Sequence, residues 1–273
     1  RLRVQLDTEV ALLLLAKAQL QSSNQILAIN ALEKLLALNP DNETAVLLMA
    51  QTLSHDGQRS AARDLLQQYL RRHPGQLIAM EALVEQHLWL GEWKSAQAMA
   101  KQAVQAGASS TMLPLVDAEI ARRNKRFADS DALYFSLLRE RAAEREATLG
   151  LFANARMQDQ YEPTFKRLQQ SLSTTASPAV GELLAREYMA LGKLDAAQEL
   201  IAQHEDDWPQ AKALSAELAV LRGDLEYAAQ QAEAYVAEHN TDVRMQLLLA
   251  SIYQRQEQAE RAIAVYREVL SYT

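Results

Sequence analysis

The feature that most constrains this chain is a period of 34 residues. Ala28, Ala62 and Ala96 are spaced by 34, and the same spacing separates Gly57 from Gly91. A fixed period of this size marks a stack of small supersecondary units, each of which depends on its neighbours to bury its apolar face. Proteins built in this way usually act through a long concave surface, so the sequence directs attention first to a binding partner and only then to an active site.

Three independent series of residues carry the period through eight units, with steps of 34, 34, 34, 34, 33, 31 and 34. The small position of the first helix is occupied by Ala16, Ala50, Val84, Ala118, Phe152, Ala185, Ala216 and Ala250. The turn position is occupied by Ser23, Gly57, Gly91, Lys125, Asp159, Gly192, Gly223 and Glu257. The small position of the second helix is occupied by Ala28, Ala62, Ala96, Ser130, Thr164, Ala197, Ala228 and Ala262.

Within one unit the apolar residues recur at helical spacing. Ala28, Leu32 and Leu35 lie three and four residues apart, which places them on one face of a helix. Pro40 then ends that helix, because the residue before a proline is pushed out of the α region. The small residues at Ala16 and Ala28 allow two helices to approach closely, so each unit is predicted to be a helix, a tight turn and a second helix.

On these residues the chain resembles the tetratricopeptide repeat family. The best matches are residues 28–42, residues 50–57 with Ala62 and Pro74, and residues 249–270 with Tyr253, Ala262 and Tyr266. The resemblance covers about residues 9 to 273. The family's usual first-helix tryptophan is replaced by Leu12, Val46, Met80 and Pro114, and its terminal proline is missing at Ala108 and Ala142.

The resemblance implies an all-α fold, a right-handed α-solenoid of tandem helix-turn-helix repeats. Composition agrees, since only 8 Gly and 6 Pro occur in 273 residues and no long β-branched alternation is present. We expect one continuous domain over residues 1–273. The repeats are predicted at about residues 9–42, 43–76, 77–110, 111–144, 145–177, 178–208, 209–242 and 243–273.

The chain ends, the net charge and the lack of cysteine bear on the length of the whole protein, its partners and its cellular compartment. The chain begins with Arg1 and has no polar capping element, so we expect it to be a segment of a longer protein. Its net charge of −7, from 28 basic and 35 acidic residues, argues against nucleic acid as a partner. The absence of cysteine fits the periplasm and the cytosol equally, and the apolar run 10–16 is too short to span a bilayer.

Motifs of the common enzyme classes do not occur in the sequence. It contains no phosphate-binding, dinucleotide-binding, zinc-protease or hydrolase signature. The local cluster His204, Glu205, Asp206 and Asp207 has the oxygen ligands of a hard cation, but a solvated loop near a helix N-terminus is the more common meaning of such a run. We therefore expect no catalytic residue, no cofactor and no metal site.

The family resemblance implies that the first helices line a concave groove. The exposed positions predicted to contact a partner there are Trp89, Glu119, Arg122, Arg123, Arg156, Arg186, Gln254 and Arg255. Because arginine binds carboxylates through two parallel hydrogen bonds, an acidic peptide or acidic polymer is one expected ligand. The alternative is that these arginines pair with Glu119 and Glu182 on neighbouring helices and stay solvated.

The fifth repeat interrupts the regular pattern. Phe152 stands where other repeats have small residues, Gly150 should weaken the first helix, and Pro163 is tolerable only in the first turn of the second helix. A polar run follows at residues 171–178, and Gly181 should weaken the next helix. Two interpretations remain open for residues 150–208, a hinge between two blocks and ordinary divergence of one repeat.

The leading functional prediction is a non-catalytic scaffold that binds a partner protein or peptide in its groove. Ala-, Gln- and Leu-rich degenerate repeats of this style resemble those of bacterial envelope assemblies for exopolysaccharide or pilus export, which would place the protein in the periplasm, with the cytoplasm as the alternative. The second prediction is a regulatory or carbohydrate-contacting module with stacking faces from Trp89, Trp93 and Trp208, although Trp93 is expected to pack between helices.

Overall fold

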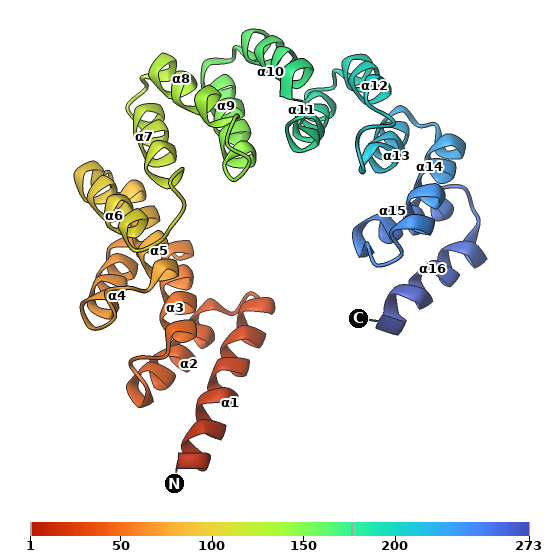
Figure 1. Cartoon of the computed structure of the whole chain (residues 1–273). Coiled ribbons are helices and arrows are strands. Elements are labelled where there is room, and N and C mark those ends of the chain that lie inside the picture. Colours follow the sequence, from red (N-terminus) through yellow and green to blue (C-terminus); the bar gives the residue numbers. More distant parts are fainter. Residues whose placement is uncertain (1, 176, 273) are drawn as a thin grey trace. The chain divides into compact units, whose positions relative to one another are not determined.

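The computed structural model describes residues 2–175 and 177–272, and the side chains of residues 6–172 and 177–271. These residues form sixteen helices and, within the same ranges, no strand (Figure 1). The helices are α1 (Leu2–Gln21), α2 (Gln25–Leu38), α3 (Glu43–His55), α4 (Arg59–Arg72), α5 (Leu77–Leu90), α6 (Trp93–Gln105), α7 (Met112–Arg123), α8 (Phe127–Leu137), α9 (Glu144–Gln158), α10 (Tyr161–Thr175), α11 (Pro178–Ala190), α12 (Leu194–Gln203), α13 (Ala211–Arg222), α14 (Leu225–Glu238), α15 (Val243–Arg255) and α16 (Ala259–Tyr272). The all-α prediction is confirmed.

The turn within each helical pair contains one residue in the left-handed backbone region. All eight turn residues predicted from the period have positive φ, from 52° at Asp159 to 82° at Gly223. Four of the eight positions hold glycine, which adopts this region without strain, and the others hold Ser23, Lys125, Asp159 and Glu257. The period in the sequence therefore marks a backbone requirement that recurs once per repeat.

The small residues of the two helices are buried where the helices of a pair approach each other. All sixteen positions of the two small-residue series are less than 9% exposed, including the non-alanine residues Val84, Phe152, Ser130 and Thr164. Ser130 shows how close the approach is, since its hydroxyl donates a hydrogen bond of 2.9 Å to the backbone oxygen of Ala118 on the partner helix. Burial at these positions is thus common to all eight repeats, although Phe152 shows that the buried residue is not always small.

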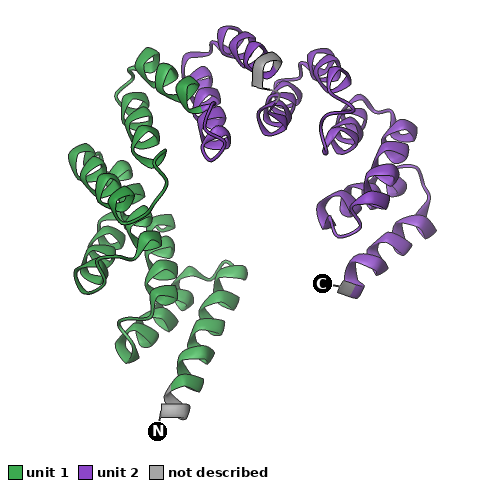
Figure 2. Cartoon of the chain, in the orientation of Figure 1, with its two compact units in different colours: residues 1–137 green, residues 138–273 purple. Residues whose placement is uncertain are grey.

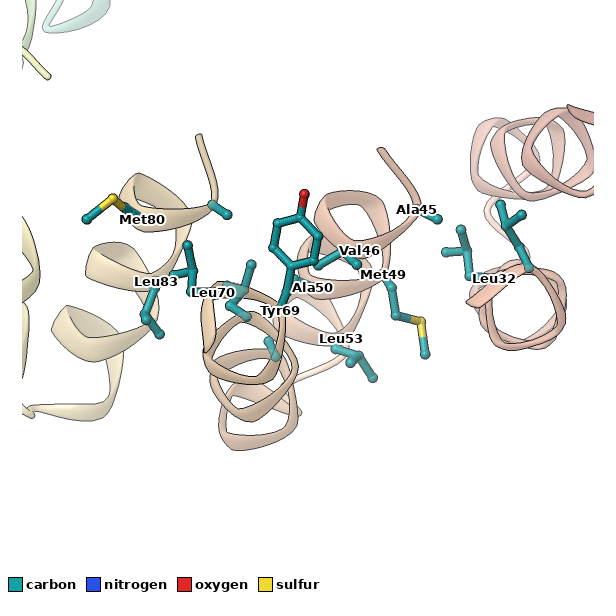
Figure 3. Close-up of a cluster of buried hydrophobic side chains, with 14 of the residues drawn as sticks. Leu32, Ala45, Val46, Met49, Ala50, Leu53, Tyr69, Leu70, Met80 and Leu83 are labelled. Atoms are coloured by element: carbon teal, nitrogen blue, oxygen red, sulfur yellow. The ribbon is translucent and has the colours of Figure 1, made fainter. Parts of the chain in front are cut away.

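Larger apolar side chains then join one helical pair to the next. Figure 3 shows Tyr69 and Leu70 of α4 lying between Val46 of α3 and Leu83 of α5. Each of these four side chains is at most 8% exposed. Burial of this size stabilises the stack by about 1.5–3 kcal/mol per large side chain, which explains why a single pair cannot stand alone.

The chain divides into two compact units, residues 1–137 and residues 138–273 (Figure 2). The division falls in the irregular segment between the end of α8 and the start of α9, earlier than the polar run 171–178 that the hinge interpretation emphasised. Residues 171–175 of that run lie in α10, residue 176 lies outside the described residues, and α11 begins at Pro178. The hinge stays a prediction.

The irregular fifth and sixth repeats keep the helical pairs by changing the side chains between them. Pro163 is the third residue of α10, in its first turn, as expected. Phe152 is 2% exposed and meets Phe165 edge to face, with 5.9 Å between ring centroids. Gly181, expected to weaken its helix, has a packing role instead, because a Cβ there would lie 2.0 Å from the indole of buried Trp208.

Candidate protein-interaction surface

The predicted contact residues all lie on first helices, but they belong to two separate compact units. Unit 1 holds Trp89 on α5 and Glu119, Arg122 and Arg123 on α7, and unit 2 holds the rest. The contacts of these side chains join residues of the same unit.

In unit 1, Glu119 is the centre of a charged cluster. Its carboxylate accepts hydrogen bonds from Arg122 Nε at 2.9 Å, from Arg123 Nε at 2.5 Å and from the Tyr134 hydroxyl at 3.3 Å. Burial alone would raise the pKa of Glu119, but the hydrogen bonds from the two guanidinium groups hold that pKa below its ordinary value. The carboxylate of Glu119 thus holds both arginines of its own helix and offsets one of their two positive charges.

Trp89 is the exposed aromatic residue of this surface, with 46% of its area accessible. The guanidinium carbon of Arg59 lies 4.5 Å from its ring centroid and that of Arg123 lies 4.3 Å away. The indole N–H donates a weak hydrogen bond of 3.4 Å to Glu85. Cation–π contacts at exposed sites stabilise by about 0.5–1 kcal/mol each, so the two arginines hold the indole in place.

The predicted arginines of unit 2 also have carboxylate partners. Arg156 on α9 binds Glu187 on α11 through two hydrogen bonds, 3.0 Å from Nε and 2.5 Å from Nη2. Arg186 on α11 pairs with Glu217 on α13, and Arg244 reaches the same carboxylate at 2.7 Å. These pairs connect the first helices of successive repeats, and the two carboxylates offset two of the three positive charges.

The observed pairs can be compared with the carboxylate partners that the sequence suggested. Arg122 and Arg123 pair with Glu119 as the alternative predicted, but Glu182 is not the partner of Arg186. Burial raises the pKa of Glu182, and Arg186 and Arg145 lower it only in part. The true partners carry a signal that sequence reasoning missed: Glu187 follows Arg156 by 31 residues and Glu217 follows Arg186 by 31, about one repeat.

The last two predicted residues lie at the end of α15. Gln254 and Arg255 are both exposed, and Gln254 accepts a hydrogen bond of 3.3 Å from the Tyr266 hydroxyl of α16. Nothing in this arrangement distinguishes the pair from other exposed polar residues of unit 2. Their role in partner binding stays a prediction.

A hollow of about 420 Å³ lies between the first helices of repeats two and three, entirely within unit 1. Helix α3 contributes Leu47, Ala50, Gln51, Ser54 and His55, helix α5 contributes Ile78, Ala82, Glu85, Gln86 and Trp89, and Arg59 begins α4. Sequence reasoning found Trp89 but missed Gln86, Arg59 and Ile78. We call this hollow the α3/α5 groove.

The acidic cluster at residues 204–207 contacts the core through its histidine. The imidazole of His204 stacks on the Trp208 ring, with 4.6 Å between centroids and 5° between planes. The Asp207 carboxylate lies 3.9 Å from His204 Nδ1. Among the side chains that the structure describes, no three histidine or acidic residues gather as a metal-binding set.

The three tryptophans differ in their availability to a ligand. Trp93 packs against the core around Ala96 and Val116, as predicted, and Trp208 is 4% exposed. Of the three rings expected to stack on carbohydrate, only that of Trp89 is exposed, and two guanidinium groups already contact it.

The helices found in residues 2–175 and 177–272 include none with the length and apolar character needed to cross a bilayer. In that part of the chain, paired helices, left-handed turns and buried small residues repeat at one spacing. This pattern defines a helical-hairpin repeat protein, a class that buries its core between neighbouring pairs.

Comparison with protein families identifies the kind of repeat. Tetratricopeptide repeat profiles match residues 27–86 and residues 243–273, and these matches support a tetratricopeptide repeat protein. Proteins of this family are generally non-catalytic scaffolds that bind protein partners. No curated protein matches the chain.

Solved structures similar to this chain include two proteins of low identity. A tetratricopeptide repeat protein from Parabacteroides merdae is 13% identical, with a TM-score of 0.47 over 90% of this chain and 99% of its own. The MamA protein is also 13% identical, with a TM-score of 0.47 over 61% of this chain and 91% of its own.

Proposed function

We propose that this protein is a non-catalytic scaffold that binds a segment of a partner protein along the first helices of its repeats. The observation that carries the proposal is the α3/α5 groove, which combines a hollow of about 420 Å³ with exposed Ile78 and Trp89. Exposed apolar and aromatic side chains around a concavity are the usual core of a protein interface.

The paired arginines make the scaffold rigid and do not select a partner by its charge. Arg156 with Glu187 and Arg186 with Glu217 connect successive first helices, so an acidic polymer would have to displace intramolecular carboxylates to bind there. Direct recognition of an acidic polymer by these side chains is therefore no part of the proposal.

Photo-crosslinking tests the proposal in the cells that make the protein. Benzoylphenylalanine is placed at Ile78 in α5 and at Leu247 in α15, both exposed on first helices, and at exposed Ile26 in α2 as the control on a second helix. The proposal expects a discrete protein adduct from the first-helix positions that is absent at Ile26. Equal adducts from all three positions, or none from the first helices, would contradict it.

The cellular location of the scaffold and the complex that it assembles are a further part of the proposal. The style of its repeats favours assembly of a bacterial envelope complex for exopolysaccharide or pilus export, and hence the periplasm. Fractionation of the source cells by osmotic shock measures this directly. Release with the periplasmic fraction agrees with the envelope role, and retention with the cytoplasm supports the regulatory alternative.

A further inference from the structure

The α3/α5 groove contains buried polar atoms that have no partner within the protein. Gln86 is 4% exposed, and its side-chain oxygen accepts no hydrogen bond. Arg59 Nε is buried in the same groove and donates none. A buried polar atom without a partner costs free energy, and few such atoms persist in folded proteins without a reason.

Arg59 differs in its ion pairing from Arg123, which also lies over the Trp89 ring. Arg123 pairs with Glu119, whereas Arg59 forms no ion pair with any side chain that the structure describes. Its guanidinium instead rests on the indole of Trp89. The groove therefore presents one positive charge that is positioned but not neutralised.

Apolar side chains line the same groove. Ile78 is 60% exposed, and Leu47 and Ala82 are half-buried. The acidic lining residue Glu85 is exposed and accepts the hydrogen bond from Trp89. An occupant that fits all of these groups needs a hydrogen-bond donor, a carboxylate and an aliphatic side chain within a short distance of one another.

We propose that the α3/α5 groove binds an extended segment of the partner protein in which an aspartate or glutamate lies next to an aliphatic residue. A backbone N–H of the segment donates to the Gln86 oxygen, and the acidic side chain accepts from Arg59 Nε. The aliphatic side chain covers Ile78 and Leu47. This inference rests on the proposed scaffold function and specifies the partner chemistry at one of its sites.

A peptide array gives the first test. The protein is applied to short random peptides that are acetylated and amidated, so that neither terminus supplies a charge. The proposal expects the retained peptides to be enriched in Asp or Glu adjacent to Leu, Ile or Val. Enrichment in Lys or Arg, retention of no peptide, or competition by an oligosaccharide would overturn it.

Two groove variants locate the binding of the best retained peptide. Arg59→Gln should lower affinity by about tenfold or more, because a charge-assisted hydrogen bond is lost. Gln86→Leu should lower affinity by about fivefold while its melting temperature stays the same or rises, since a buried unpaired amide is removed. A side chain kept only for stability would not show this opposition between binding and stability.

Arg71→Gln is the matched control, because Arg71 is exposed on the same helix as Arg59 and lies outside the groove. Its affinity should equal that of the unmodified protein. Equal affinity of the Arg59 variant and this control would overturn the groove assignment. If crosslinks at Ile78 and Leu247 persist while no acidic–aliphatic peptide binds, the scaffold function stands and only the partner chemistry fails.

Discussion

The regular block formed by α2 to α5 and the irregular block formed by α9 to Trp208 build the same helical pairs with different side chains. In the regular block, Ala50 and Ala62 let the helices approach. In the irregular block the equivalent residues are Phe152 and Thr164, and both are still buried. The comparison teaches that the repeat requires burial and a left-handed turn, while the size of the residue at the close approach can change if its neighbours change with it.

The two blocks also differ in what they leave open. The irregular block fills its interior with Phe152, Phe165 and Tyr188 in edge-to-face contacts, and Trp208 occupies the space above Gly181. The regular block leaves the α3/α5 groove with buried polar atoms unpaired. The irregular block therefore uses its unusual side chains for packing, whereas the regular block keeps a groove that is open to a partner.

The largest effect is expected from removing the aromatic filler of the irregular block. Phe152→Ala should lower the free energy of unfolding of unit 2 by about 3–5 kcal/mol, since a buried aromatic side chain is replaced by a cavity. Urea unfolding followed by circular dichroism measures it. Leu149→Ala, at an exposed position of the same helix, is the control and should change little. Similar losses for both variants would show that Phe152 has no special packing role.

A slightly smaller loss is expected at the Gly181–Trp208 contact. Gly181→Ala places a methyl group about where the indole lies and should destabilise unit 2 by about 3 kcal/mol. Adding Trp208→Leu should recover part of that loss, because the smaller side chain makes room. Gly75→Ala is the control, since a Cβ there meets nothing within 4 Å. Unfolding of Gly181→Ala at the unmodified midpoint would sink this explanation.

An intermediate effect with a defined pH dependence is expected in unit 1. The pKa of Glu119 in the folded state lies below its ordinary 4.5, so the ionised carboxylate stabilises the fold above that pH. Glu119→Gln should cost about 1–3 kcal/mol at neutral pH. The difference between variant and unmodified protein should shrink as the pH falls from 4.5 through the lowered pKa. A difference that stays constant down to acid pH would argue against the charged cluster.

The smallest effect concerns the left-handed turns that both blocks share. Asp159→Gly in the irregular block should stabilise by about 0.5–1 kcal/mol, because glycine adopts a φ of 52° without strain. Gly57→Ala in the regular block, where φ is 79°, should destabilise by a similar amount. Thermal melting of both variants compares them. Changes of the same sign in the two blocks would mean that the turns are not equivalent.

The fold was readable from the sequence because its requirements are local and repeated. Each repeat needs one residue that adopts the left-handed turn and two buried residues, usually small, where its helices approach each other. Each requirement therefore left a series of eight residues, and even Glu257 and Lys125, which no turn propensity favours, were found by spacing alone.

The site was less predictable because it depends on which side chains meet. The sequence placed Arg156 and Arg186 on first helices but could not say that Glu187 and Glu217 neutralise them. Likewise, Gln86 has the position of a buried helix residue, and only the absence of a partner atom around its oxygen marks it as unusual. The common spacing of 31 residues is compatible with such pairs, but only the rotamers and distances show which carboxylate each arginine contacts.

Photo-crosslinking and mass spectrometry first identify the partner. Hydrogen exchange is then compared between the free protein and the protein saturated with that partner. This comparison tests the central claim most directly. The claim is that the regular block binds the partner while the paired arginines of the irregular block stay bound to their own carboxylates. It predicts slower exchange on binding in α3 and α5, residues 43–55 and 77–90, with α9 and α11 unchanged. Protection confined to α9 and α11, with α3 and α5 unchanged, would contradict it.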